Sequence, residues 1–298
     1  MQVTVLAALF AAVSSFLGLA AHVAELGPRE KAALLVVSSP PAPPGVAGVL
    51  LHYYEIDAPR PRGALVLVDQ EGGPVRAYRN LPPVRAAAEY ASAAEAFATG
   101  ERTAAALRRV GVHVDLAPVL DARDGPLGSR HFADPAFGVA FARGLASGGV
   151  AACAKHFPGL GSTATSTDGR EPVYGVVRAG EVAGFRDTVR AGVPCVMVSH
   201  AIYPRFGRRP ASLMPKAYRL LRSTGFEGIA ITDELGVLGS EGAPTWARLA
   251  VLAGADLVLF SSARDAQRAI DALVPLARKG LLDEHVLRVL RFRESFGP

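Results

Sequence analysis

The sequence predicts an α/β protein of the TIM (β/α)8 barrel class, and three observations support this prediction. Eight short apolar runs recur along the 298 residues, and each is nearly continuous, as in parallel strands buried on both faces. Segments rich in alanine, arginine and glutamate separate most of the runs and have helical composition. The length suits one barrel, since such barrels often reach about 250 residues as one unit. The runs are ALLVVSS (33–39), GVLLHYY (48–54), ALVLVDQ (64–70), HVDLAPVLD (113–121), VAACAKHF (150–157), CVMVSHA (195–201), GIAITDE (228–234) and DLVLFSS (256–262).

The connections between the runs predict where outer helices form. Residues 89–111 and 135–149 are helix-like, and each segment ends at a glycine that can cap a helix. Only PPAPPGVA separates the first two runs, and EIDAPRPRG separates the second from the third. Both connections are too short and too rich in proline for a covering helix. We therefore expect a trimmed barrel that lacks one or two outer helices near its first strands.

Composition excludes several classes of protein. Half of the residues are hydrophobic and the mean hydropathy is +0.25, which favours a large core over disorder. The formal net charge is +5, and almost all of the positive charge is arginine scattered among acids. Such scattering is typical of solvated helix faces, so no nucleic-acid partner is expected.

The first 24 residues differ from the rest because they carry no acidic or basic side chain apart from His22. Their apolar character predicts a signal peptide or membrane anchor over residues 1–24, followed by a barrel over residues 25–298. The expected location is therefore exported or membrane-anchored in a bacterium, with possible membrane association through residues 1–24. No basic stretch precedes the apolar run, so a core helix, a start codon assigned too early and a cytoplasmic location remain alternatives.

Cys153 and Cys195 are the only cysteines, and both lie within apolar runs. Two buried free thiols are expected rather than a disulfide. The cysteines lack metal-site spacing, and no metal or organic cofactor is signalled. A monomer is favoured.

Polar residues gather where the predicted strands end, which is where barrel enzymes hold their chemistry. Each group alone has a structural explanation, such as capping a helix, but their convergence favours an active site. The groups are Asp69 to Gly73, Asp121, Lys155 and His156, Ser199 and His200, Asp233 and Glu234, and Ser261 and Ser262.

Seven motifs in order resemble one known family. The resemblance is to the catalytic barrel of glycoside hydrolase family 3, particularly its single-domain bacterial β-N-acetylglucosaminidases, and it runs from about Leu26 to the end of the sequence. The motifs are DQEGG (69–73), VDLAPVLD (114–121), SRHF (129–132), KHFPG (155–159), VMVSHAIYP (196–204), PASL (210–213) and GFEGIAITDELG (225–236).

The resemblance implies roles for particular residues. Asp233 matches the nucleophile of the family, which forms a covalent glycosyl-enzyme and retains the anomeric configuration. Four further positions match residues that hold sugar hydroxyls, and His200 at the next strand end is expected to line the same pocket. A purely structural ion pair of Lys155 with Asp69 or Asp233 is the alternative for that lysine. The four positions are Asp69, Arg130, Lys155 and His156.

The residue that protonates the leaving group is not evident. The family's single-domain glucosaminidases use a histidine paired with an aspartate in a D-S-H element after KHFPG, and Ser166-Thr167-Asp168 stands there instead. The family's second histidine, in PGHG, is Leu160. Asp168 is the leading candidate for the general acid/base, because burial can raise the pKa of a carboxyl group into the useful range. The alternatives are Glu171, Glu234, a partner chain, or a protein that binds a glycan without cleaving it.

The sequence thus predicts a retaining exo-β-glycosidase. Its expected substrates are terminal β-N-acetylglucosamine residues of cell-wall or chitin fragments. A Schiff-base enzyme using Lys155, as in barrel aldolases, is disfavoured by the KHFPG context and by Asp233.

Overall fold

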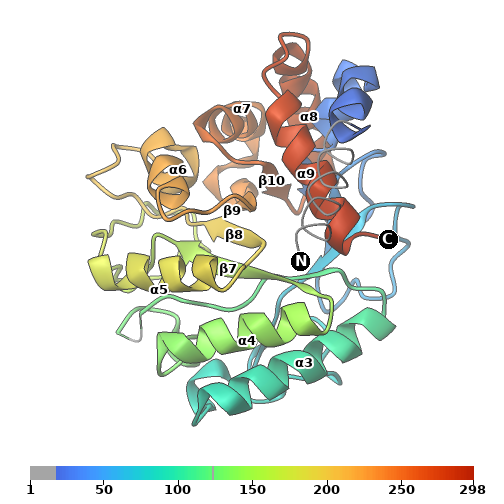
Figure 1. Cartoon of the computed structure of the whole chain (residues 1–298). Helices are drawn as coiled ribbons and strands as arrows, with labels where there is room; N and C mark the ends of the chain where they lie inside the picture. The colour runs from blue at the N-terminus through green and yellow to red at the C-terminus, as the bar shows by residue number, and fades with distance from the viewer. Residues whose placement is uncertain (1–17, 123) are drawn as a thin grey trace, which may run out of the picture.

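Eight parallel strands form a closed barrel in the computed structural model, which describes residues 18–122 and 124–298 (Figure 1). Around the barrel the order is β1-β10-β9-β8-β7-β6-β3-β2, so β2 closes back onto β1. The predicted (β/α)8 barrel is confirmed. The strands are β1 (Val36–Ser38), β2 (Gly48–Leu51), β3 (Leu65–Val68), β6 (Val114–Asp115), β7 (Ala151–Phe157), β8 (Cys195–Val198), β9 (Ile229–Glu234) and β10 (Leu257–Phe260).

The outer helices are unevenly distributed around the barrel. No helix is present among the described residues between β1 and β2 or between β2 and β3, which confirms the predicted trimming. That side of the barrel, light blue in Figure 1, carries loops in place of helices. The helices are α2 (Pro28–Ala33), α3 (Ala93–Arg109), α4 (Pro135–Ser147), α5 (Ala179–Arg190), α6 (Pro215–Arg222), α7 (Ala243–Ala253), α8 (Ala263–Ala277) and α9 (Asp283–Phe296).

The core consists of two apolar layers. One layer fills the barrel with alternate side chains of the strands, among them Leu67, Leu116 and Ile231. Val289 and Phe292 of α9 join this interior layer. The last helix therefore covers one end of the barrel, and the opposite end, where the strands finish, is left for the polar residues. The second layer lies between the strands and the outer helices.

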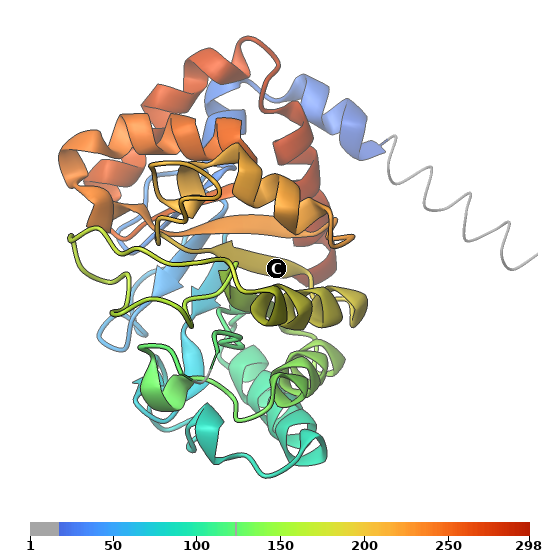
Figure 2. The same cartoon turned by 90° about the vertical axis from the view of Figure 1, so that its left-hand side faces the viewer.

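Helices α3 and α4 pack side by side at very short range (Figure 2). Gly100 of α3 and Gly144 of α4 face each other, and a methyl group added to Gly144 would lie 2.2 Å from the carbonyl oxygen of Phe97. Only glycine allows the two backbones to approach this closely. The contact fixes α4, which leads directly into β7.

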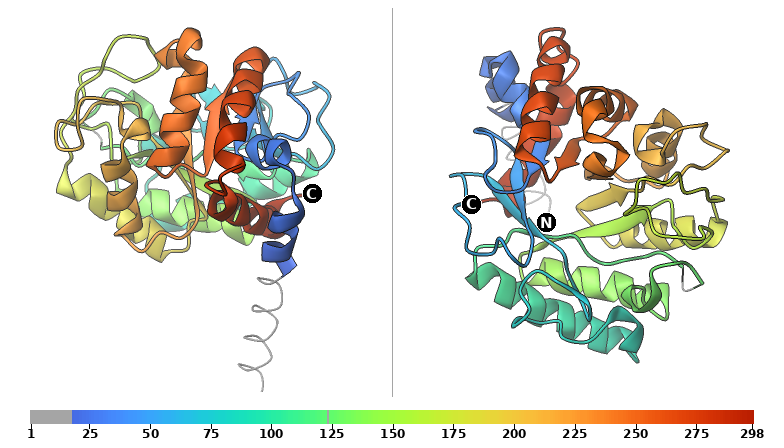
Figure 3. Two further views of the ribbon diagram at one scale, coloured as in Figure 1. Left: turned by 90° about the horizontal axis from the view of Figure 1, so that it is seen from above. Right: turned by 180° about the vertical axis from the view of Figure 1, so that it is seen from behind.

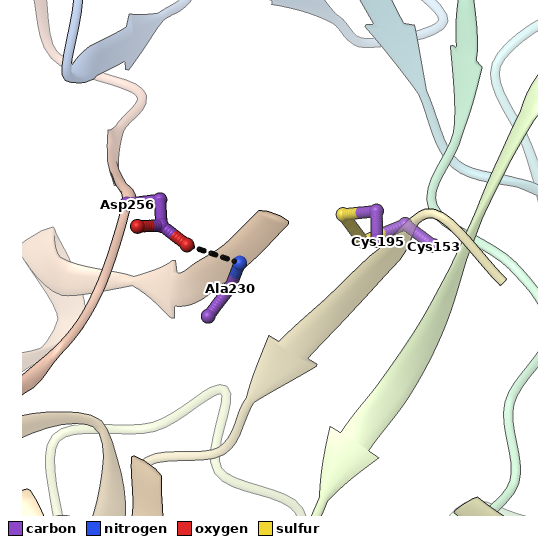
Figure 4. The surroundings of a disulfide bond; sticks show 4 residues. All are labelled: Cys153, Cys195, Ala230 and Asp256. Atoms are coloured by element: carbon purple, nitrogen blue, oxygen red, sulfur yellow. Dashed lines mark hydrogen bonds between the residues drawn. A yellow bond between two sulfur atoms is a disulfide. The ribbon is translucent and has the colours of Figure 1, made fainter. Parts of the chain in front are cut away.

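Cys153 and Cys195 form a disulfide inside the barrel, so the expectation of two free thiols is wrong (Figure 4). The prediction of burial is correct, because both residues are at most 2% exposed. The two residues lie directly opposite each other on neighbouring strands β7 and β8, and their Cα atoms are 4.3 Å apart. Apolar runs predict buried strands, but they do not reveal which residues of two strands face each other.

The N-terminal prediction falls partly outside the described residues. Residues 1–17 of the predicted signal peptide or anchor are not described, and residues 18–25 are helical. Leu19 and Val23 of this segment are buried, and the segment lies beside α9 (Figure 3). Throughout residues 18–122 and 124–298, the helices are too short or too polar to cross a membrane. The role of residues 1–24 stays a prediction.

Candidate active site

The polar rim is built by the parallel strands, since their carboxyl ends all meet at one end of the barrel. Lys155 and His156 lie in β7, and Asp233 lies in β9. Asp69 follows β3 directly, and Arg130 belongs to the short 3-10 turn Gly128–Arg130 beyond β6. The structure thus brings most of the predicted site residues to one rim.

A buried ion cluster forms the floor on the β3–β7 side. The Lys155 ammonium lies 2.5 Å from Asp69 Oδ1 and 2.6 Å from Glu71 Oε1. Arg130 donates two parallel hydrogen bonds of 2.8 Å to the Glu71 carboxylate. A ligand can reach Asp69 and Arg130, whose side chains are 32% and 18% exposed, whereas Lys155 and Glu71 are 2% exposed.

The charges of this cluster support one another. Burial alone would raise the pKa of Glu71, but Lys155 and Arg130 lower it to about 2. Burial alone would lower the pKa of Lys155, but Asp69 and Glu71 raise it above its usual value. Both groups are therefore charged at neutral pH. The ion pair of Lys155 with Asp69, which was the structural alternative for this lysine, is present, and it leaves Asp69 able to accept hydrogen bonds from a ligand.

Glu71 was not assigned a site role from the sequence, although a signal was present. Side chains of an extended segment alternate between its two sides, so Asp69 and Glu71 face the same way while Gln70 faces the other. Gln70 indeed bonds away from the cluster, since its amide accepts from the Tyr78 backbone N–H and donates to the Tyr78 carbonyl. The spacing of the two acids in DQEGG therefore predicts that Glu71 faces the same side as Asp69.

Asp121 orients His156. Its carboxylate lies 2.7 Å from His156 Nδ1 and also accepts from the Leu160 backbone N–H at 2.7 Å. This arrangement leaves Nε2 as the ring nitrogen that can contact a ligand. Leu160 replaces the histidine of the family motif and is buried, so its backbone rather than its side chain serves the site.

His200 has both ring nitrogens engaged. Nδ1 lies 2.7 Å from Ser212 Oγ, and Nε2 lies 2.9 Å from the carbonyl oxygen of Glu234. The ring lines a cavity of about 160 Å³ together with Thr167. Its predicted contact with a sugar hydroxyl stays a prediction, and its bonds fix the segment that carries Asp233.

Asp233 is an ionised carboxylate at the end of β9. Burial would raise its pKa, but the neighbouring His200 and His156 rings, the Glu234 backbone N–H and Lys155 together lower it below the ordinary value for aspartate. The Glu234 backbone N–H donates to Oδ1 at 2.9 Å, and the Thr167 hydroxyl lies 3.4 Å from Oδ2. A fixed anion surrounded by histidines is chemically suited to attack an electrophilic carbon or to stabilise a developing cation.

The loop after β7 brings Asp168 to the rim but does not bury it. Thr167 is buried against Asp233, whereas Asp168 and Glu171 are exposed. The charge of Asp168 acts on Arg130. Burial, which was the expected means of adapting Asp168 to acid catalysis, is therefore absent.

The hydrogen bonds of Glu234 engage its carboxyl group and hold it away from a role as the general acid. One oxygen accepts from the Ser261 N–H and hydroxyl, at 2.7 and 2.6 Å, and the other accepts from the Gly236 N–H at 2.9 Å. Burial raises the pKa of Glu234. The carboxyl group ties β9 to the end of β10.

Among the residues that the structure describes, no group of three or more histidine, cysteine or acidic side chains is arranged to hold a metal ion. What they do provide is an anionic carboxylate facing a set of donors and acceptors suited to hydroxyl groups. Together with the barrel, this set of groups defines the class of glycoside hydrolases.

Comparison with known proteins identifies the family. Residues 52–292 match the model of the glycosyl hydrolase family 3 N-terminal domain, which covers most of the chain. The chain therefore belongs to glycosyl hydrolase family 3, and the resemblance drawn from the seven motifs is confirmed.

Several relatives and solved structures match more than two thirds of this chain. The chain is 35% identical over 230 residues to a beta-hexosaminidase of Stenotrophomonas maltophilia, covering 68% of this chain and 69% of that protein. Among solved structures, M tuberculosis LpqI superimposes with a TM-score of 0.80 at 26% identity, covering 92% and 96% of the two chains. NagZ of Neisseria gonorrhoeae, in complex with N-trifluoroacetyl-D-glucosamine, gives a TM-score of 0.66 at 27% identity, covering 83% and 84%. This chain spans 62% of a Paenibacillus family 3 β-N-acetylglucosaminidase, with a TM-score of 0.79 at 26% identity.

Proposed function

We propose that the protein is a retaining exo-β-glycosidase that removes terminal β-N-acetylglucosamine from cell-wall or chitin fragments. The observation that carries this proposal is Asp233, an ionised carboxylate at the end of β9 that stands across the barrel from Asp69. In the closed order of eight strands, β9 and β3 are four positions apart. A sugar ring held between the two carboxylates is bound by Asp69 on one side and attacked by Asp233 on the other.

The reaction proceeds in two displacements. An oxygen of Asp233 bonds to the anomeric carbon as the bond to the leaving oxygen breaks, and the general acid gives that oxygen a proton. Water then attacks the same carbon, the acid takes one proton of the water back, and Asp233 is released. Two inversions restore the original configuration.

The remaining residues hold the sugar. Asp69 accepts hydrogen bonds from hydroxyl groups, and the Lys155 ammonium, 2.5 Å from Asp69 Oδ1, holds the carboxylate in place. His156 donates or accepts through Nε2, since Nδ1 is engaged by Asp121. Arg130 positions Glu71 and borders the same floor.

Asp168 supplies the proton in this proposal. It follows Thr167, whose hydroxyl lies 3.4 Å from the nucleophile, so a small closure of the loop over a substrate brings its carboxyl group near the leaving oxygen. Closure also removes water from Asp168, and this is the condition for efficient acid catalysis.

The N-acetyl sugar is favoured by the relatives. The matched S. maltophilia and Neisseria proteins are named beta-hexosaminidases, and the NagZ complex contains a glucosamine derivative. For this chain, β-N-acetylglucosaminides are therefore the first substrates to test.

We also propose export or membrane anchoring through residues 1–24. Cell fractionation with N-terminal sequencing tests this proposal, and an intact Met1 in the soluble cytoplasmic fraction contradicts it.

A second candidate function is glycan binding without hydrolysis. The exposed position of Asp168 and the absence of a histidine in the loop from 159 to 173 favour it. In this alternative the floor of Asp69, Lys155 and His156 binds a sugar, and no group protonates the leaving oxygen.

A panel of nitrophenyl β-glycosides, with calorimetry for binding, separates the two functions. A hydrolase cleaves the N-acetylglucosaminide with retention, and Asp233→Asn abolishes turnover while keeping the fold and sugar binding. Mass spectrometry of the wild type with a slow fluorinated substrate then finds the sugar on Asp233. Unchanged activity of Asp233→Asn rejects the nucleophile, and binding of a sugar with no cleavage by the wild type selects the second function.

A further inference from the structure

A second cavity begins at Asp69, on the side of the barrel opposite β9, which carries the nucleophile. It has a volume of about 270 Å³, and its walls come from the residues after β2 and from the hairpin of β4 (Gln70–Gly72) and β5 (Val75–Arg76). Asp69 lines this cavity and also contacts Lys155, whereas Asp233 does not line it. Asp69 thus lies between the floor of the candidate active site and this cavity.

Two exposed tyrosines form one wall. Tyr53 is 54% exposed and Tyr54 is 69% exposed, and their rings meet edge to face with centroids 5.1 Å apart. The ring of His52 stacks on Tyr54, and the guanidinium of Arg79 lies 4.3 Å from the Tyr53 ring centre. These contacts position both rings while leaving them exposed. The exposed surface of this pair of rings suits a ligand with one apolar face and a polar edge, as in a pyranose ring.

The position of the cavity relative to Asp233 indicates which carbon of a bound sugar carries a substituent that reaches the cavity. In a pyranose ring the anomeric carbon and C4 lie at opposite corners. When the anomeric carbon faces Asp233 in β9, C4 points to the opposite wall, where Asp69 follows β3. A substituent on the C4 oxygen therefore extends past Asp69 into the cavity between Tyr53, Tyr54 and the hairpin.

We infer that this cavity is a subsite for a second, β-1,4-linked sugar, which packs against the exposed pair of Tyr53 and Tyr54. The enzyme then removes a disaccharide unit from the non-reducing end of a chain, as well as a single sugar. The volume suits one ring, being near the lower limit of about 300 Å³ for pockets that hold larger small molecules. This inference rests on the proposed function.

The missing helix is what makes room for the subsite. The connection between β2 and β3, residues 52–64, is a loop with no covering helix, and its first residues turn towards Asp69. Arg76 braces the other wall, because it donates to the carbonyl oxygens of Gly73 and Arg79. The cavity is therefore shaped by hydrogen bonds and ring contacts rather than by a helix surface.

The test compares nitrophenyl β-N-acetylglucosaminide with nitrophenyl β-N,N′-diacetylchitobioside. The wild type is expected to release intact disaccharide and nitrophenol from the second substrate in one step, as seen by mass spectrometry of the first products. In a Tyr53→Ala/Tyr54→Ala variant, kcat/KM for disaccharide release falls about tenfold, while the monosaccharide substrate changes less than about twofold. Leu281→Ala is the control, because Leu281 is 50% exposed between α8 and α9 and far from the rim.

Three outcomes overturn the subsite. They are first products that contain N-acetylglucosamine and nitrophenyl N-acetylglucosaminide but no intact disaccharide, an equal loss on both substrates, and no loss on either. If the wild type cleaves neither substrate, the proposed function has failed, and the subsite is then tested by calorimetry on the wild type. Tighter binding of diacetylchitobiose than of N-acetylglucosamine, lost in the double tyrosine variant, supports it; equal affinities reject it.

Discussion

Lys155 shows how a single residue can serve both the fold and the site. Its ammonium is 2% exposed and lies between Asp69 and Glu71, so the energy of burying a charge is offset by two anions. Arg130 on the outer side of Glu71 completes the neutralisation. The cluster stiffens the floor and holds the carboxylate of Asp69 in place to accept hydrogen bonds from hydroxyl groups.

Replacement of Glu71 by glutamine is expected to destabilise the protein at neutral pH and to flatten its stability in acid. The pKa of Glu71 is about 2 in the folded state against an ordinary 4.5, so its contribution is present above pH 4.5 and is lost as pH falls towards 2. The contribution is on the order of 3 kcal/mol. Urea unfolding of both proteins between pH 7 and pH 3 measures this, and a difference that stays constant across that range contradicts it.

Replacement of Asp168 by alanine is expected to slow substrates with poor leaving groups by about 10²–10⁴-fold, the usual size of general acid catalysis. Nitrophenyl substrates depart with little protonation, so their first step is affected less. Steady-state kinetics on both kinds of substrate test the role, and Glu171→Ala is the matched control in the same loop. An equal effect on both substrates, or none, removes Asp168 as the acid.

At the scale of elements, the contact between α3 and α4 depends on glycines that no apolar pattern would single out. A Cβ at Gly144 would lie 2.2 Å from the Phe97 carbonyl oxygen and 2.9 Å from the Glu101 nitrogen, both backbone atoms. Side-chain adjustment cannot relieve such contacts. The helices would have to separate, and β7 follows directly after α4.

Gly144→Ala is therefore expected to lower the free energy of unfolding by roughly 2 kcal/mol, despite the gain in helix propensity of about 1 kcal/mol. Gly184→Ala in α5 is the matched control, because its nearest neighbour would be the Pro135 Cβ at 3.7 Å. That variant should be neutral or slightly stabilised. Thermal unfolding compares the two, and equal behaviour of both variants would refute the packing argument.

Much of the element order could be predicted from the sequence, because continuous apolar runs reflect strands buried on both faces. The run from His113 to Asp121 is an instructive exception. Its strand β6 covers only Val114–Asp115, and Val119 then bridges to Lys155 as an isolated pair. The hairpin of β4 and β5 was not expected either, since its polar residues have no apolar period.

The site was predicted less completely than the fold. Residues of recognisable motifs, such as Asp233 and Lys155, lie at the rim as expected. The exposure of Asp168 depends on the path of a loop, and the bonds of Glu234 depend on β10, so neither follows from local sequence. Cys153 and Cys195 were misread because their pairing depends on the register of β7 against β8.

At the scale of the molecule, the disulfide joins two strands that end in site residues. Cys153 precedes Lys155 in β7, and Cys195 begins β8, which leads to Ser199 and His200. The bond links residues 42 positions apart. It restricts the unfolded chain and so favours the closed barrel.

A Cys153→Ala/Cys195→Ala variant is expected to lose stability, by roughly 4 kcal/mol according to the chain-entropy account of a 42-residue link. Denaturant unfolding of the wild type with and without reductant provides the comparison that leaves the side chains in place. Thiol titration of the unfolded, non-reduced protein should find no free thiol. Two titrating thiols would show that the bond is absent.

The packing of α9 side chains against the barrel interior also affects when the protein can fold during synthesis. Val289 and Phe292 contribute to the layer that fills the barrel, and they leave the ribosome after all eight strands because α9 follows β10 in the sequence. Until they emerge, the strands enclose apolar surface that has no partner at one end. Chaperone contact during synthesis should therefore last until residues 283–296 are free to dock, and the catalytic rim at the other end then becomes rigid as a late event.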